Sequence, residues 1–127
     1  MPKIIIVQGI SNRGKTTAIK AAMNHCGVFV GFGGEDVLLI ATLNIKGVSC
    51  TIGFASGGDS PAAVQTNVNF FTPHPSLPAL THMIFACRSR GGGIAILNAF
   101  AQSISVQPIM IAAPDPQLVT LILNNIP

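Results

Sequence analysis

The sequence predicts an α/β fold in which helices cover both faces of a mostly parallel, five-stranded sheet, giving a three-layer sandwich. Short apolar, β-branched runs alternate along the chain with longer segments that can be helical. Two adjacent strand-like runs are separated by a short turn, so one antiparallel hairpin is expected within the sheet. The length of 127 residues suits one domain, predicted over residues 1–127.

The predicted strands are apolar runs bounded by turn residues. The first is basic and then β-branched, which is typical of a strand buried on both faces. Asn44 and Gly47 favour the turn of the hairpin. Pro108 cannot donate to a strand ladder, so the last strand must lie at an edge or begin only at Ile109. The predicted strands are 3–7, 36–43, 48–55, 82–87 and 105–112, with a short further one at 28–30.

The predicted helices occupy the segments between these strands. Ser60 is an N-cap candidate and Pro61 suits the first helical position, so the second helix should begin there. The predicted helices are 16–23, 62–71, 94–102 and 116–125. Their expected inward-facing residues are Ile19, Ala22 and Met23 in the first helix and Val64, Val68 and Phe71 in the second.

The most informative motif is Gly9-Ile10-Ser11-Asn12-Arg13-Gly14-Lys15-Thr16, which fits the pattern G-x-x-x-x-G-K-[ST]. It follows the first predicted strand and opens the first predicted helix. A glycine-rich turn in that position leaves backbone N–H groups directed into one concavity, where the helix dipole also favours negative charge. This context predicts a phosphate-binding loop.

On these residues the chain resembles the P-loop NTPase superfamily, and the resemblance implies a P-loop NTPase fold that binds ATP with Mg²⁺. It implies that Lys15 reaches the β- and γ-phosphate oxygens and that the Thr16 hydroxyl ligates the metal. The small size and the arginine loop described below resemble the nucleotide-kinase layout. The nucleotide-binding residues implied in this way are Gly9, Ser11, Asn12, Arg13, Gly14, Lys15, Thr16 and Thr17.

Composition restricts the partners. Charged residues make up only 9% of the chain, against roughly 25% in ordinary soluble domains. Either a partner, expected to be a second copy of the chain, covers much of the surface, or the protein is only modestly soluble. The net charge is +3, but only seven basic residues carry it, too few for a nucleic-acid track. The long uncharged segment 91–114 contains Asn, Gln, Ser and Pro, so no membrane span is expected.

Cysteine usage and the N-terminus indicate a cytoplasmic protein. Cys26, Cys50 and Cys87 are odd in number and lack C-x-x-C spacing, which argues for packed thiols in a reducing compartment. The N-terminal apolar run is too short for a signal peptide.

Only four acids are available, and Asp59 is the best candidate for a Mg²⁺-linked and catalytic carboxylate. It follows the strand 48–55, and its position resembles the acid of a Walker B strand, although Gly57 and Gly58 intervene. The alternative is that Asp59 caps the helix starting near Pro61. Glu35 and Asp36 could approach a second substrate, or could only solubilise a turn.

Arg88 and Arg90 form the second candidate site. They follow a predicted buried strand at the sheet edge where ligands bind in open α/β sheets, and Gly91-Gly92-Gly93 follows them. Two arginines on such a hinge can close over phosphates and neutralise developing charge. The alternative is a solvated basic turn.

The sequence leaves three functions open. The first is a small phosphotransferase, with Lys15, Arg88, Arg90 and Asp59 as catalytic residues and a small molecule or nucleotide as acceptor. The second is an ATP-binding or ATPase switch that acts through a protein partner. The third is a P-loop that binds phosphate without catalysis. The N-K-x-D pattern of GTPases is absent from the sequence, which favours ATP over GTP.

Overall fold

The computed structural model describes residues 2–9, 14–31, 35–72 and 80–127. Along the chain lie β1 (Lys3–Gln8), α1 (Lys15–His25), β2 (Leu38–Ile45), β3 (Val48–Ala55), α2 (Pro61–Phe71), β4 (His82–Cys87), α3 (Gly92–Ser103), β5 (Ile109–Ala112) and α4 (Leu118–Leu123). The predicted alternation of strands and helices is confirmed.

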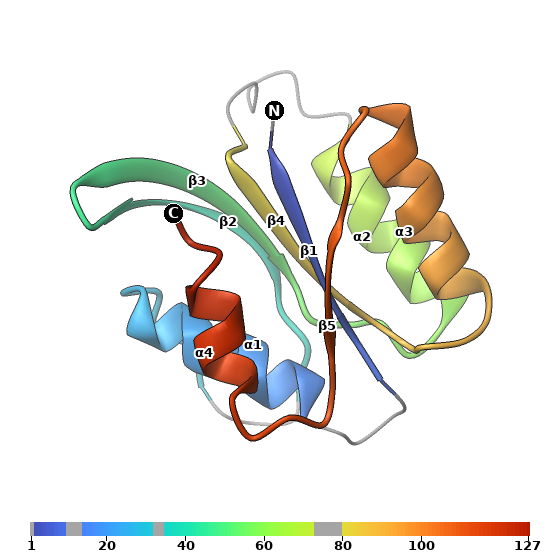
Figure 1. Ribbon diagram of the computed structural model, residues 1–127, viewed down its shortest axis with the longest axis horizontal. Helices are drawn as coiled ribbons and strands as arrows, with labels where there is room; N and C mark the ends of the chain where they lie inside the picture. Colours follow the sequence, from blue (N-terminus) through green and yellow to red (C-terminus); the bar gives the residue numbers. More distant parts are fainter. Residues whose placement is uncertain (1, 10–13, 32–34, 73–79) are drawn as a thin grey trace.

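The five strands form one mixed sheet in the order β2-β3-β4-β1-β5. β1 lies at the interior and pairs in parallel with β4 on one side and β5 on the other. β3 is parallel to β4, whereas β2 runs antiparallel to β3. The sheet is therefore mostly parallel with one antiparallel hairpin, as predicted (Figure 1).

Helices cover both faces of the sheet, which explains why β1 is apolar at successive positions. Ile5 and Val7 belong to the core cluster on the face covered by α1 and α4, whereas Ile4 and Ile6 belong to the cluster beneath α2 and α3. All four side chains are fully buried. Figure 1 shows the two helix pairs on opposite sides of the strands.

The predicted helix faces are confirmed. Ile19, Ala22 and Met23 of α1 and Val64, Val68 and Phe71 of α2 are buried. Ser60 caps α2, since its hydroxyl accepts a hydrogen bond from Ala63 N at 3.1 Å.

Three predicted elements differ from the structure. Residues 28–30 are not a strand, because Asn24 Oδ1 accepts from Val30 N at 2.9 Å and holds the segment against the end of α1. The last strand begins at Ile109 and not at residue 105, which confirms the alternative start that Pro108 predicted. The last helix is shorter than 116–125, because the Asp115 carboxylate accepts from Gln117 N at 2.7 Å and forms a turn ahead of α4.

The hairpin turn lies within the predicted residues 44–47 but is shorter than predicted. Lys46 and Gly47 both have positive φ, 52° and 80°, and they form a two-residue turn that suits the right-handed twist of the strands. β2 therefore extends to Ile45 instead of ending at residue 43. Among the described residues, no helix is long and apolar enough to span a membrane.

Candidate functional site

The candidate site lies where β1, β3, β4 and β5 end, at the edge of the sheet that carries ligands in open α/β folds. Gly9 N donates to Cys87 O at 3.1 Å, so the segment that follows β1 starts beside the end of β4. Ala113 N donates to Gln8 O at 2.7 Å, which places the segment after β5 on the other side.

Two glycines of the G-x-x-x-x-G-K-T motif are required by the backbone. A Cβ at Gly9 would lie 2.8 Å from Ala113 O, so a larger residue would collide with the segment after β5. Gly14 has φ +79°, in the left-handed region that glycine enters without steric cost. Gly14 is the N-cap of α1 and provides no side-chain cap, and the first turn of α1 contains no acid. The positive end of this helix is therefore not offset by its own residues.

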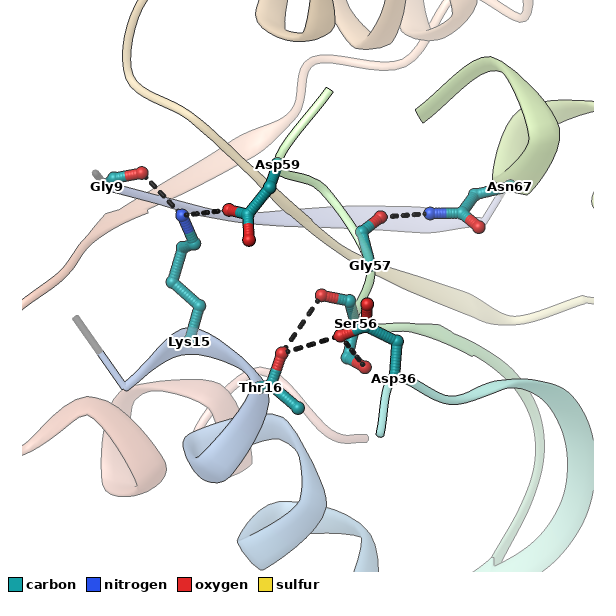
Figure 2. Close-up of polar contacts among 8 residues, drawn as sticks. All are labelled: Gly9, Lys15, Thr16, Asp36, Ser56, Gly57, Asp59 and Asn67. Atoms are coloured by element: carbon teal, nitrogen blue, oxygen red, sulfur yellow. Dashed lines mark hydrogen bonds and ion pairs between the residues drawn. The ribbon is translucent and has the colours of Figure 1, made fainter. Parts of the chain in front are cut away.

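Lys15 is the first residue of α1, and its side chain is buried at 6% exposure. Its ammonium donates to Gly9 O at 2.5 Å, across the motif. Asp59 Oδ1 lies 3.6 Å from the same nitrogen, although the Asp59 side chain is 64% exposed. Figure 2 shows Lys15 and Asp59 pointing toward one another. The structure thus brings together two residues predicted for the site.

Thr16, the residue after Lys15, also contacts an acid, but this acid is Asp36 and not Asp59. Its hydroxyl lies 3.0 Å from Asp36 Oδ1 and 3.2 Å from Ser56 O, within donating distance of both acceptors (Figure 2). The buried Ser56 hydroxyl lies 3.4 Å from the same Asp36 oxygen and accepts from Val37 N at 2.8 Å. Asp36 is therefore held beside Thr16 through two hydroxyl groups.

The segment that carries Asp59 is fixed by close backbone packing. A Cβ at Gly58 would collide with the backbone carbonyl of Ala86 in β4, so this position requires glycine. The side chain of Asn67, in α2, donates to Gly57 O at 2.5 Å (Figure 2). Asn67 is 6% exposed, and this bond satisfies a buried amide while it anchors the start of the segment.

Arg88 and Arg90 lie on the segment between β4 and α3, and both are exposed. Because Cys87 pairs with Gln8 in the parallel ladder, Arg88 follows β4 at the same sheet edge as the motif. Thr17, in the first turn of α1, lines a cavity beside this edge.

Cys87 is unsuited to nucleophilic chemistry despite its position. It is fully buried at the end of β4, and burial raises the pKa of its thiol to about 11, although the positive charge of Lys15 acts in the opposite direction. The thiol stays protonated at neutral pH. Cys87 and Cys50 are buried free cysteines, and Cys26 is half-buried.

A cavity of about 490 Å³ lies on the β5 side of the motif. It is formed between the first turns of α1 and the segment that leads from β5 into α4. Its lining is mostly apolar, and Asp115 and Thr17 are the residues of the lining that have polar side chains. The lining residues are Gly14, Thr17, Ala18, Ala21, Pro114, Asp115, Pro116, Leu118 and Val119.

Sequence reasoning singled out Asp59 but gave Asp36 no definite role. No local pattern predicts that Asp36 lies beside Thr16, because the two meet only through the pairing of β2 with β3 and the packing of α1 on the sheet. Ser11, Asn12 and Arg13, also predicted for the site, lie outside the described residues. Within the described ranges, no group of three or more His, Cys, Asp or Glu side chains could hold a metal ion.

Comparison with known proteins identifies no relative of this chain. The chain matches no protein-family model, and neither a curated protein nor a solved structure is significantly similar to it. The fold is an α/β sandwich, and its function has to be argued from the site.

Proposed function

We propose that residues 9–16 are a Walker A loop and that the protein is an ATP-dependent phosphotransferase acting on a small molecule or nucleotide. The observation that carries this proposal is the position of Lys15. Its buried ammonium lies at the N-terminus of α1 and is held by Gly9 O at 2.5 Å. Burying a cation at the positive end of a helix is costly unless an anion is bound there.

A polyphosphate is an anion of the kind that suits this position. Lys15 has a weak counterion in Asp59, at 3.6 Å and mostly exposed, and phosphate oxygens beside Gly14 would replace this contact with charge-assisted hydrogen bonds. The uncapped first turn of α1 would add backbone donors. The placement of Lys15 is therefore suited to a bound nucleotide.

The residues around Thr16 fit a Mg²⁺ ion. This ion prefers oxygen ligands and is usually held by one or two carboxylates together with water and substrate phosphates. The Thr16 hydroxyl and the Asp36 carboxylate, 3.0 Å apart, offer this set of donors. When bound, Mg²⁺ would neutralise charge on the β- and γ-phosphates. In this proposal Asp36 takes the metal-linked role that the sequence suggested for Asp59.

The apolar cavity beside α1 suits the nucleoside part of ATP. It begins at Gly14 and Thr17, directly after Lys15, so a nucleotide with its phosphates at Lys15 could extend into it. Arg88 and Arg90, on the β4 side of the same edge, would neutralise charge on the group being transferred. A cytoplasmic location, where ATP and reduced thiols coexist, belongs to this proposal.

A switch that acts through a protein partner is the second candidate. It is favoured by one observation, the contact of Asp36 with Thr16 only two residues before the edge strand β2 begins. A ligand that displaces Asp36 would also act on the start of that strand. In this case ATP hydrolysis would be slow and unaffected by small acceptors.

Calorimetric titration of the protein with Mg·ATP, Mg·GTP and inorganic phosphate tests the binding claim. We expect micromolar binding of Mg·ATP, with Lys15→Ala weakening it at least 100-fold. Lys3→Ala is the matched control, because it removes an exposed lysine at the start of β1, at the opposite end of the sheet. Equal binding by Lys15→Ala and the parent would refute the assignment.

Product analysis then separates the two functions. ADP release stimulated more than tenfold by a nucleoside, nucleotide or small alcohol, with the phosphorylated acceptor recovered, supports the phosphotransferase. Slow ADP release that no acceptor accelerates supports the switch.

A further inference from the structure

The outer edge of β2 carries the strongest feature that the proposed function does not use. β2 is an edge strand of eight residues, Leu38–Ile45, and contains neither a charged residue nor a proline. In the described part of the chain, its only ladder partner is β3. Edge strands of soluble proteins usually carry charges, prolines or bulges that prevent pairing with another chain.

The opposite edge of the same sheet is protected. β5 has only four residues and starts directly after Pro108, and a short edge beside a proline offers few pairing groups. Among the described residues, one edge of the sheet is therefore blocked and the longer edge has no strand paired with it.

The hairpin turn determines which groups of β2 face outward. In a two-residue turn, Ile45 and Val48 exchange hydrogen bonds, and bonded positions then alternate along the strand. Consistent with this alternation, Ser56 N donates to Val37 O at 3.0 Å. The residues with odd numbers are thus bonded to β3. The backbone N–H and C=O groups directed away from β3 belong to Leu38, Ile40, Thr42 and Asn44.

We propose that two copies of the chain pair through this edge, with β2 antiparallel to β2 of the second copy across a two-fold axis at Ala41. Of the symmetric registers, this one pairs all four outward residues, Leu38 with Asn44 and Ile40 with Thr42 of the second copy, and their symmetry mates. Each pair exchanges two hydrogen bonds. The two sheets become one continuous sheet of ten strands. This inference does not depend on the proposed function.

The same register places apolar side chains opposite one another on the face toward α1 and α4. Val37 faces Ile45, Leu39 faces Leu43, and Ala41 faces Ala41. All five side chains are partly buried at the margin of the core, so the second copy would extend that core. Such cross-strand apolar pairs stabilise antiparallel sheets.

Charge complementarity favours a second copy of this chain as the occupant. The only charged residues from 35 to 47 are Glu35 and Asp36, before β2, and Lys46, after it. With the axis at Ala41, Lys46 of the second copy lies opposite Asp36 and next to Glu35. The two-fold axis forms this contact twice.

Cysteine cross-linking tests the register, because opposite residues in a non-hydrogen-bonded antiparallel pair are close enough for a disulfide. In a Cys26→Ala background, Ala41→Cys should form a covalent dimer under mild oxidation. Leu43→Cys, the matched control, should not, because its symmetry mate lies several residues away along the strand. The double variant Leu39→Cys with Leu43→Cys should cross-link again. A dimer that cross-links equally through Leu43→Cys alone would overturn the register.

Sedimentation over a concentration series tests the dimer itself. Thr42→Lys, on the exposed outer edge, should raise the dimer Kd at least tenfold, whereas Thr66→Lys, on the exposed side of α2, should leave it unchanged. Lys46→Glu should raise Kd about threefold to tenfold, because it places two acids opposite one another, and adding Glu35→Lys should recover part of that loss. A chain that remains monomeric at all concentrations refutes the proposal.

Amide hydrogen exchange tests the same pairing on the unmodified chain, so the result does not depend on how a variant folds. The amides of Ile40 and Thr42 should be protected at concentrations above Kd and should exchange rapidly below it. Equal exchange at both concentrations would also refute the proposal.

Discussion

Two short acidic segments approach the G-K-T end of the motif, one before β2 and one after β3, and they make different contacts. Asp36, before β2, lies beside the neutral Thr16 hydroxyl and is held by Ser56. Asp59, after β3, lies 3.6 Å from the Lys15 ammonium and is mostly exposed. Both carboxylates therefore reach the start of α1, but within the described part of the chain only Asp59 has a cation as its partner.

The two contacts suit two different roles, one beside a metal ion and one as the counterion of Lys15. Under the proposed function, the acid beside the hydroxyl would gain a strong partner in Mg²⁺, whereas the acid beside Lys15 would compete with phosphate for its ammonium. Under the proposed function, removal of the Asp36 charge should weaken nucleotide binding, and removal of the Asp59 charge should strengthen it.

Gly58→Ala should have the largest effect, because it disrupts the segment that carries Asp59. The added Cβ would collide with backbone of β4, which cannot move without disturbing the sheet, so we expect a loss of about 3 kcal/mol or more in the free energy of unfolding. Urea denaturation measures it. Gly31→Ala is the control, since its Cβ would meet nothing within 4 Å, and its effect should stay within about 1 kcal/mol. Equal stability of the two variants would show that the segment is not fixed at Gly58.

Asp36→Asn should have the next largest effect, about 10- to 100-fold weaker binding of ATP in the presence of Mg²⁺. The amide keeps the size of the side chain and can still accept from Thr16, but it lacks the charge that Mg²⁺ prefers. Without Mg²⁺ the variant and parent should bind nucleotide alike. Titrations with Mg²⁺ and with a chelator provide the comparison, and an equal loss in both would assign Asp36 to the fold instead of the metal.

Asp59→Asn should change affinity in the opposite direction and by less. Loss of a negative charge near Lys15 should tighten binding of inorganic phosphate and metal-free ADP about twofold to fivefold, because the carboxylate is exposed and screened by solvent. Calorimetric titration at low and high salt checks this, and the gain should shrink at high salt. Weaker binding by the variant would instead indicate that Asp59 contacts the ligand or its metal.

The smallest expected effect is on the pH dependence of stability, and it comes from a histidine that lies far from the candidate site. His82 is buried at the start of β4, at the opposite end of the sheet from the acids. Burial, and then the charge of Lys3, lower its pKa, although a hydrogen bond with Asn125 acts in the opposite direction. The unfolded chain therefore binds this proton more readily, and stability should fall as pH decreases below about 6.5.

His82→Gln should remove that part of the pH dependence and leave nucleotide binding unchanged at every pH. Thermal unfolding between pH 5 and 8 measures the first expectation, and titration with Mg·ATP measures the second. A change in binding would mean that the two ends of the sheet are coupled.

The sequence predicted most of the fold and half of the acidic site. The run His82–Cys87 was predicted with its observed bounds, because a fully buried strand leaves an uninterrupted apolar signal. The short strand at 28–30 was wrong, because apolar residues beside Asn24 resemble a strand until the side chain of Asn24 binds their backbone.

The pairing of Asp59 with Lys15 could be anticipated, since an acid after a strand lies at the sheet edge where the motif begins. The contact of Asp36 with Thr16 could not. It depends on β2 running antiparallel, which returns the start of that strand to the edge where β3 ends. Sequence patterns of single segments do not contain that information.

The glycine at position 58 has a consequence for recognising distant relatives of this chain. The G-x-x-x-x-G-K-[ST] pattern occurs in many unrelated sequences, so the pattern alone is weak evidence that two chains are related. Any chain whose backbone crosses β4 as closely as this one must keep a residue without Cβ there, ten residues after the strand begins at Val48 and directly before the acid. Divergent sequences that share this architecture should be recognised by the pair formed by the buried Gly58 and the G-x-x-x-x-G-K-[ST] motif, even where their surface residues have changed.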